Sequence, residues 1–181
     1  MVLTETKLKG CFILEPRVFK DHRGYFFESF NKALFEKATG FSVNFIQDNE
    51  SKSSKGVLRG LHFQKGKYAQ SKLVRVVKGS ILDVCVDIRK TSKTFGQYVS
   101  IILDDKKKKQ IYVPKGFAHG FLVLEDETII NYKCDNYYHQ PSEGGIIYND
   151  TTLNINWEYP TELLELSEKD LHLPTFEEYF K

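Results

Sequence analysis

Residues 81–88 carry the pattern that most constrains the fold of this chain. Leucine, valine or isoleucine occupies every even position there, while Asp83, Cys85 and Asp87 occupy odd ones. Successive side chains of a β-strand point to opposite sides, so a period of two indicates a strand whose faces meet different surroundings. We therefore expect a strand at 81–88, with Cys85 buried as a small apolar side chain.

Other short runs rich in β-branched and aromatic residues also predict strands. They cover residues 73–77, 98–103, 110–113, 117–124 and 128–134. Polar turns separate them, and residues 106–109, all lysine, are expected to form a solvated hairpin turn whose charge protects a sheet edge. Short strands with closely spaced turns predict an antiparallel sandwich or barrel.

Helix signals are few and lie outside the strand-rich middle of the chain. Residues 31–39 end at Gly40, and residues 161–166 and 167–171 form two further short candidates near the C-terminus. No repeat or linker divides the 181 residues, a length that suits one domain with a real core. We expect one all-β domain over residues 1–181, with short helices at the periphery and C-terminus.

Composition excludes several classes of function. The chain is 41% hydrophobic and 28% charged, and its net charge of +2 argues against nucleic-acid binding as the main role. No apolar stretch reaches the roughly 20 residues of a membrane span, and the first residues lack the features of a secretory signal. Three distant cysteines predict neither a disulfide framework nor a zinc knuckle. A cytoplasmic protein is the expectation.

Two glycine-flanked segments each contain a histidine, His62 and His119. The second has the spacing P-x-G-x-x-H and resembles a motif of the cupin superfamily of small β-barrels. Metal-binding cupins resemble one another in adding an H-x-H pair and a glutamate. Here the first segment reads His62-Phe63-Gln64 with no such glutamate, and glutamine is a poor ligand for transition metals. We therefore expect no functional metal.

Seven motifs in sequence order carry a closer resemblance. They are Phe19-x-Asp21-x-Arg23-Gly24-x-Phe26-x-Glu28, Gln47-Asp48-Asn49-x-Ser51, Gly56-Val57-Leu58-Arg59-Gly60-Leu61-His62-x-Gln64, Lys72-Leu73-Val74-x-Val76-x-x-Gly79, Asp83-Val84-x-Val86-Asp87-x-Arg89, Pro114-x-Gly116-Phe117-Ala118-His119-Gly120-Phe121 and Tyr132-x-Cys134-x-x-x-Tyr137-Tyr138. Together they resemble the dTDP-4-dehydrorhamnose 3,5-epimerase family from about residue 19 to residue 174, with the cupin-like antiparallel barrel, or jelly roll, of that family.

The resemblance implies an isomerase of dTDP-L-rhamnose biosynthesis, and hence of carbohydrate biosynthesis. Its substrate would be dTDP-4-keto-6-deoxy-D-glucose, and its product dTDP-4-keto-L-rhamnose. The C3 and C5 protons lie next to the C4 ketone and are therefore the acidic ones. Inversion needs a base on one face, an acid on the other and stabilisation of an enolate. No redox cofactor is required, and the chain has no glycine-rich dinucleotide loop.

The resemblance also assigns catalytic roles. His62 would be the base, since imidazole titrates near neutral pH, and Asp170 would orient and stabilise it as a dyad. Tyr132 would be the acid on the opposite face. Lys72 would lie near the C4 oxygen, where its charge stabilises the enolate.

The remaining expected contacts bind the nucleotide and sugar. Arginine side chains match phosphate oxygens, so Arg23 and Arg59 are expected to bind the pyrophosphate. The other expected contacts are Glu28, Gln47 and Asn49 through hydrogen bonds, Tyr138 by stacking on the base, and His119, Glu143 and Lys169. The family resemblance implies a homodimer with an N-terminal strand crossing to the partner, where Arg23 and Glu28 would complete the neighbouring pocket.

Competing interpretations remain open from sequence. Ser167-Glu168-Lys169-Asp170 matches a helix capping box, so Asp170 could serve a helix terminus instead of His62. His62 and Tyr132 could be packing residues. The same base and acid would also serve an epimerase of C3 alone, of C5 alone, or of another sugar nucleotide such as a GDP-linked heptose. A sugar-nucleotide-binding barrel without catalysis would need the arginine and aromatic contacts but not His62 and Tyr132 together.

Overall fold

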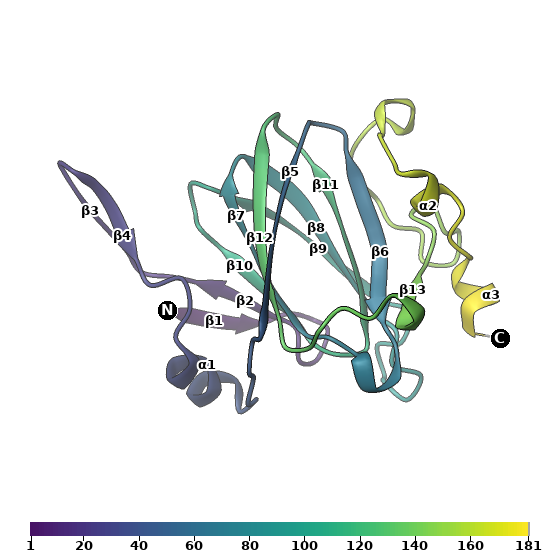
Figure 1. Cartoon of the computed structure of the whole chain (residues 1–181), viewed down its shortest axis with the longest axis horizontal. Helices are drawn as coiled ribbons and strands as arrows, with labels where there is room; N and C mark the ends of the chain where they lie inside the picture. Colours follow the sequence, from purple (N-terminus) through teal and green to yellow (C-terminus); the bar gives the residue numbers. More distant parts are fainter. Residues whose placement is uncertain (181) are drawn as a thin grey trace.

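The computed structural model describes residues 1–180, whose strands form two facing antiparallel sheets and a separate hairpin (Figure 1). In spatial order, one sheet contains β1 (Val2–Glu5), β2 (Phe12–Glu15), β10 (Gln110–Val113), β7 (Lys72–Lys78), β12 (Thr128–Cys134) and β5 (Gln47–Ser53). The other contains β13 (Glu143–Gly145), β6 (Leu58–Gln64), β11 (Phe117–Val123), β8 (Ser80–Asp87) and β9 (Tyr98–Asp104). This is the all-β antiparallel arrangement that the strand pattern predicts.

The strand β8 shows why its sequence alternates. Ile81 and Cys85 enter the core between the two sheets, whereas Leu82 and Val84 pack on the opposite face. That outer face is covered by residues 146–180, which we call the C-terminal segment, through Ile146, Leu153, Trp157 and Phe176. Both faces are therefore buried but in different surroundings, and the expectation of a buried Cys85 is confirmed.

The hairpin of β3 (Val18–Asp21) and β4 (Gly24–Phe27) pairs with neither sheet and extends away from the body of the molecule (Figure 1). It carries Phe26 with 70% of its surface exposed. A strand pair that leaves a large aromatic side chain in water buries little apolar area of its own, so other surfaces must contribute to its stability.

The helices lie at the periphery, as expected. Helix α1 (Lys32–Thr39) begins after Asn31, whose side chain accepts a hydrogen bond from Leu34 N, and ends at Gly40 in the left-handed conformation. It covers the outer face of the six-stranded sheet through Phe35. The others are α2 (Glu168–Leu171), α3 (Phe176–Phe180) and the 3₁₀ turns Gly66–Tyr68, Gln140–Ser142 and Thr161–Leu163.

Two local expectations were wrong. The helix expected at 161–166 stops at Leu163, because Glu165 pairs its backbone with Gly56 and Leu58 instead of continuing a helix. The turn at 106–109 is not uniformly solvated. Lys108 is buried, and its ammonium group donates a hydrogen bond to the Tyr25 hydroxyl at 3.0 Å and lies 4.6 Å from the ring centroid. The lysine run does not indicate that Tyr25 of the β3–β4 hairpin covers Lys108.

No helix within residues 1–180 combines the length and apolar character that crossing a membrane requires.

Candidate active site

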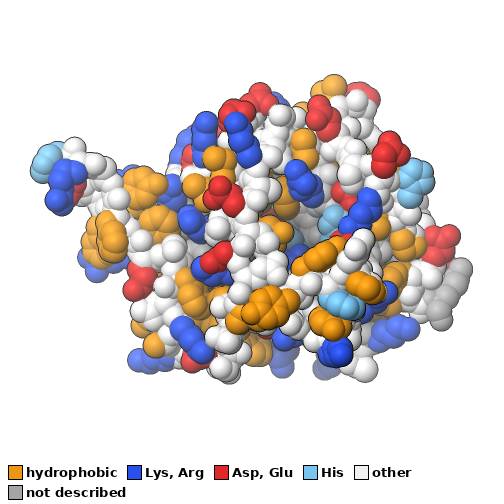
Figure 2. Space-filling view, in the orientation of Figure 1, with side chains coloured by type: hydrophobic (Ala, Val, Ile, Leu, Met, Phe, Trp, Pro, Cys, Tyr) orange, Lys and Arg blue, Asp and Glu red, His pale blue; other side chains and the backbone are white. Residues whose placement is uncertain are grey.

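Two adjoining cavities open between the sheets. The larger, of about 470 Å³, contains seven of the expected residues: Arg59, His62, Lys72, His119, Tyr132, Lys169 and Asp170. The smaller, of about 290 Å³, adds Gln47, Asn49, Tyr138 and Glu143. His62, Lys72 and Tyr132 line both cavities and so stand where the two meet. Figure 2 shows this face hollowed near its centre, with basic and histidine side chains inside.

The six-stranded sheet supplies one wall through strict alternation. Tyr132 of β12 lies opposite Asn49 of β5, and the next inward position, Cys134, lies opposite Gln47 of β5 and Lys72 of β7. Residues directly opposite in an antiparallel pair share a face of the sheet. The spacing of two between Gln47 and Asn49 therefore places both side chains toward the cavity.

The five-stranded sheet supplies the other wall, with a break in its alternation. His62 of β6 lies opposite His119 of β11, yet Arg59, only three residues earlier, lies opposite Phe121. This register shift puts Arg59 and His62 on the same side, although regular alternation would separate them. Gly60 is required there, since a Cβ would lie 2.5 Å from Gly120 Cα at a φ of +123°.

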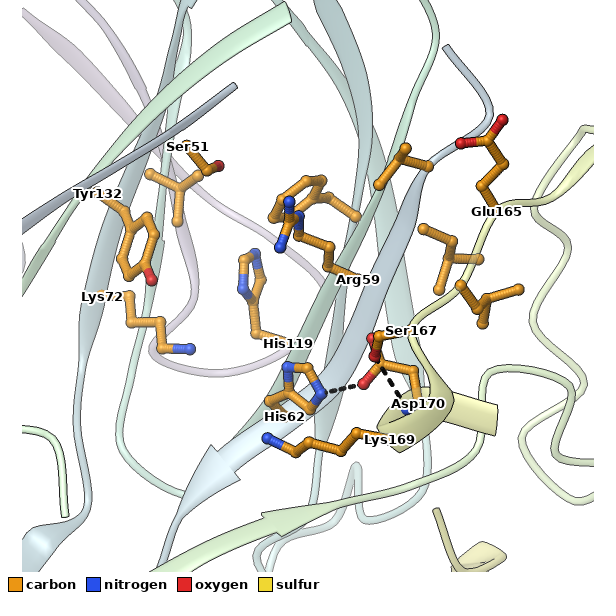
Figure 3. Close-up of a pocket in the computed structure, with 15 residues that line it drawn as sticks. Ser51, Arg59, His62, Lys72, His119, Tyr132, Glu165, Ser167, Lys169 and Asp170 are labelled. Atoms are coloured by element: carbon orange, nitrogen blue, oxygen red, sulfur yellow. Dashed lines mark hydrogen bonds and ion pairs between the residues drawn. The ribbon is translucent and has the colours of Figure 1, made fainter. Parts of the chain in front are cut away.

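Asp170 holds the ring of His62. Its Oδ1 lies 2.5 Å from His62 Nε2, and the carboxylate side chain is only 4% exposed (Figure 3). Burial acts to raise the pKa of Asp170, but hydrogen bonds from His62, Ser167 and the Gly60 amide outweigh it and lower the pKa overall. Asp170 is thus held as a carboxylate against the imidazole.

Asp170 takes part in the cap of α2 as well as in the contact with His62. Ser167 Oγ accepts a hydrogen bond from the Asp170 backbone amide at 3.2 Å and caps α2. The Asp170 carboxylate contacts His62 Nε2 at 2.5 Å and also receives a hydrogen bond from the side chain of Ser167, the cap residue. The cap and the contact with the imidazole therefore occur together.

His119 has a carboxylate partner as well. Its Nε2 lies 2.8 Å from Oδ2 of Asp83, a fully buried residue of β8. The two imidazoles in the cavity are thus each fixed by an aspartate from a different element. Asp83 was assigned no role from sequence, where it is one of the polar residues of an alternating strand.

Lys72 and Tyr132 face His62 from the opposite sheet (Figure 3). The Lys72 ammonium group lies 5.8 Å from the centroid of the Tyr132 ring. Burial lowers the pKa of Lys72, partly offset by negative charge around it. Burial raises the pKa of Tyr132, so the phenol keeps its proton across the neutral range. The wall thus offers a phenolic proton beside a half-buried amine.

The smaller cavity is bordered by a connected polar group. Glu143 accepts hydrogen bonds from Lys169 at 2.6 Å and from the Tyr138 hydroxyl at 3.0 Å. Gln47 donates to Asn49 and accepts from the Tyr138 amide. These residues therefore hold one another at a mouth where the aromatic ring of Tyr138 is exposed.

Arg23 and Glu28 are the two expected site residues that line neither cavity. Arg23 sits in the turn of the β3–β4 hairpin, 79% exposed, and pairs with Asp21. Glu28 is exposed just after β4 and accepts a hydrogen bond from Asn31. Within this chain, the structure does not bring them to the other site residues.

Several residues that line the cavities were given no role from sequence, among them Ser51, Gln70 and Glu165. Ser51 continues the alternation of Gln47 and Asn49, so that signal was available. Glu165 arrives through the C-terminal segment, and Gln70 through a loop, where no periodicity indicates the direction of a side chain.

Comparisons with known proteins agree on one family. The family model for dTDP-4-dehydrorhamnose 3,5-epimerase matches residues 5–178. The dTDP-4-dehydrorhamnose 3,5-epimerase of Escherichia coli (strain K12) is 51% identical over 181 residues, covering 100% of this chain and 97% of that protein.

Solved structures of related epimerases have the same fold as this chain. The dTDP-4-dehydrorhamnose 3,5-epimerase from Elizabethkingia anophelis NUHP1 has a TM-score of 0.95 at 52% identity, over 98% of this chain and 97% of that one. The dTDP-6-deoxy-D-glucose-3,5-epimerase RmlC from Legionella pneumophila Philadelphia 1, in complex with dTDP-4-keto-L-rhamnose, has a TM-score of 0.92 at 45% identity, over 96% and 92%. This chain belongs to the dTDP-4-dehydrorhamnose 3,5-epimerase family and is an isomerase.

Proposed function

We propose that this epimerase inverts C3 and C5 of dTDP-4-keto-6-deoxy-D-glucose, with His62 as the base and Tyr132 as the acid. One observation carries the assignment: the imidazole and the phenol come from opposite sheets and line the same two cavities. Inversion requires a proton to leave one face of the sugar and arrive at the other. A ring held between the two walls would meet both groups.

His62 is suited to remove the proton because a carboxylate lies against its ring. His62 takes the proton at C3 or C5, and the Asp170 carboxylate stabilises the imidazolium that forms. The electron pair of the broken C–H bond moves into the C4 carbonyl to give an enolate. The phenol of Tyr132 then delivers its proton to the opposite face of the same carbon.

The enolate oxygen needs positive charge in a site shielded from water. Lys72 is the cation on the Tyr132 wall, and a preorganised charge is commonly the largest catalytic contribution in such a site. Arg59, whose guanidinium donates to Ser53 Oγ at 3.2 Å, remains available at the larger cavity for the pyrophosphate.

The smaller cavity suits the remaining polar parts of the nucleotide sugar. Gln47, Asn49, Glu143 and Lys169 supply donors and acceptors, and the exposed ring of Tyr138 supplies a surface for stacking on the base. No cofactor is part of the proposal, because both proton transfers use side chains of the chain itself.

A homodimer completes the proposal. Arg23 lies on a hairpin that extends from the body, with Phe19, Tyr25 and Phe26 exposed around it. Exposed aromatic side chains on a projecting strand pair favour packing against a second copy, where Arg23 and Glu28 would reach the partner's cavity. A cytoplasmic location is supported by three buried free thiols, which suit a reducing compartment.

Incubation with dTDP-4-keto-6-deoxy-D-glucose in D2O tests the chemistry. Mass spectrometry should find two deuterium atoms, one at C3 and one at C5, because each abstracted proton is replaced from a solvent-exchanged acid. One deuterium would identify a mono-epimerase, and none would refute proton transfer next to the ketone.

Two substitutions assign the roles. His62→Ala should abolish deuterium incorporation, whereas His172→Ala should leave it unchanged, since His172 is exposed and lines neither cavity. Unchanged incorporation in His62→Ala would remove the imidazole from the mechanism.

A further inference from the structure

His119, a wall residue of the larger cavity, belongs to a group of potential metal ligands. Asp83, Cys85 and His119 each offer one donor atom, and all three atoms lie within 4.8 Å of one another. Asp83 and Cys85 are fully buried, and His119 is nearly so. Among residues 1–180, no other group of three or more His, Cys, Asp and Glu side chains has donor atoms this close together.

The fold explains why the three atoms converge. Asp83 and Cys85 are two positions apart on β8 and therefore project from the same face of that strand. His119 lies directly opposite Cys85 on β11. Its Nε2 is 2.8 Å from Asp83 Oδ2, and Cys85 Sγ lies 3.6 Å from Asp83 Oδ1. The ligands thus sit on two paired strands of the rigid sheet and not on loops.

We infer that these three side chains form an inhibitory Zn²⁺ site at the wall of the sugar cavity. A carboxylate oxygen, a thiolate sulfur and an imidazole nitrogen are the donors that zinc accepts. Three protein ligands leave the fourth tetrahedral position open, and one of them, His119, lines the larger cavity, whereas Asp83 and Cys85 are fully buried.

The binding step balances without a redox partner. The S–H bond of Cys85 breaks, its proton passes to water, and a Zn–S bond forms. Without metal, Nε2 of His119 carries the proton that it donates to Asp83; on metal binding this proton passes to water and Nδ1 takes one from water, so that the neutral ring offers its Nε2 lone pair to the metal. The charges of one carboxylate and one thiolate then balance the dication, which limits its repulsion of the Lys72 ammonium group nearby.

Inhibition follows from the place of the ion, and this part rests on the proposed function. A bound Zn²⁺ would engage His119, a wall residue of the larger cavity and an expected substrate contact, and so withdraw it from the substrate. It should therefore compete with the nucleotide sugar and raise the apparent KM, and a chelator should reverse the effect.

Binding is tested without substrate, by calorimetric titration of the chelator-treated protein with ZnCl2 and by the absorption spectrum with CoCl2. One equivalent should bind, and Co²⁺ should give a thiolate charge-transfer band. Cys85→Ala should lose that band and weaken Zn²⁺ binding at least about 100-fold, more than loss of an outer-shell partner causes. Cys134→Ala is the matched control, because its thiol is also buried beside the cavities and should leave metal binding unchanged.

Activity gives the second readout. Cys85→Ala should retain its metal-free turnover and resist Zn²⁺ at concentrations that inhibit the native chain. Metal binding lost in Cys134→Ala but kept in Cys85→Ala would overturn the site. Binding as expected without inhibition would overturn the inhibitory role. A failure of the deuterium experiment would count against the epimerase mechanism and leave the binding result standing.

Discussion

Asp170→Asn isolates the contribution of the carboxylate that contacts His62, the proposed base. The substitution keeps the size of the side chain but removes the negative charge 2.5 Å from His62 Nε2. Hydrogen bonds to charged groups contribute about 1.5–3 kcal/mol. Since each 1.36 kcal/mol is tenfold in rate, kcat should fall about 10- to 150-fold. KM should change little, because Asp170 contacts the imidazole and acts on the charge that develops after substrate has bound.

Steady-state kinetics of the native chain and the variant give kcat and KM. The matched control is Asp150→Asn. Asp150 is another buried carboxylate of the C-terminal segment, where it accepts hydrogen bonds from the Leu153 and Phe176 amides and lines neither cavity. It should lose stability and keep its kcat. If Asp170→Asn kept kcat within about twofold, or if both variants lost it equally, the dyad would not be the cause.

Three further predictions follow from burial and backbone geometry. Tyr132→Phe should lower kcat by about 10²–10⁴, the usual contribution of a positioned acid, while hydrogen exchange at C3 survives; equal loss of exchange and turnover would contradict its role as acid. Gly60→Ala should lower both the Tm and activity, because its Cβ would meet Gly120, whereas Gly24→Ala, also at positive φ but with open space around it, should lower the Tm less. Asp87 has a pKa lowered to about 2, since hydrogen bonds led by Arg89 outweigh the opposing effect of burial. Its stabilisation, about 2 kcal/mol, is complete above pH 3.8 and lost as the pH falls through 2. Urea unfolding should show Asp87→Asn less stable than the native chain at pH 7 and equally stable near pH 2; an equal deficit at both would refute the linkage.

The strand with the strongest hydrophobic alternation could be predicted from sequence. Strand β8 was expected because Leu82, Val84 and Val86 alternate with Asp83, Cys85 and Asp87. Strand β5, in contrast, reads Gln-Asp-Asn-Glu-Ser-Lys-Ser and offers no apolar alternation. It lies at a sheet edge and lines a polar cavity, so neither of its faces needs apolar side chains, and hydrophobic periodicity misses it.

The site was predictable where strands point side chains and less so elsewhere. Eleven of the thirteen expected residues line the cavities; seven of them lie on β5, β6, β7, β11 and β12, and the other four lie between β12 and the C-terminus. Glu165 was missed because its position depends on the C-terminal segment crossing back over β6. Arg23 and Glu28 lie away from both cavities within this chain, because the β3–β4 hairpin pairs with neither sheet.

His62, the proposed base, and Asp170 belong to parts of the molecule held together in different ways. His62 is fixed by strand pairing inside a sheet, whereas Asp170 lies on a short helix of the C-terminal segment, which packs apolar side chains on either side of that helix against the sheet's outer surface. Detachment of this outer layer would disable the enzyme while both sheets remain intact. On gentle heating, turnover should therefore report whether the tail of the chain is docked, and should disappear before the β-structure melts.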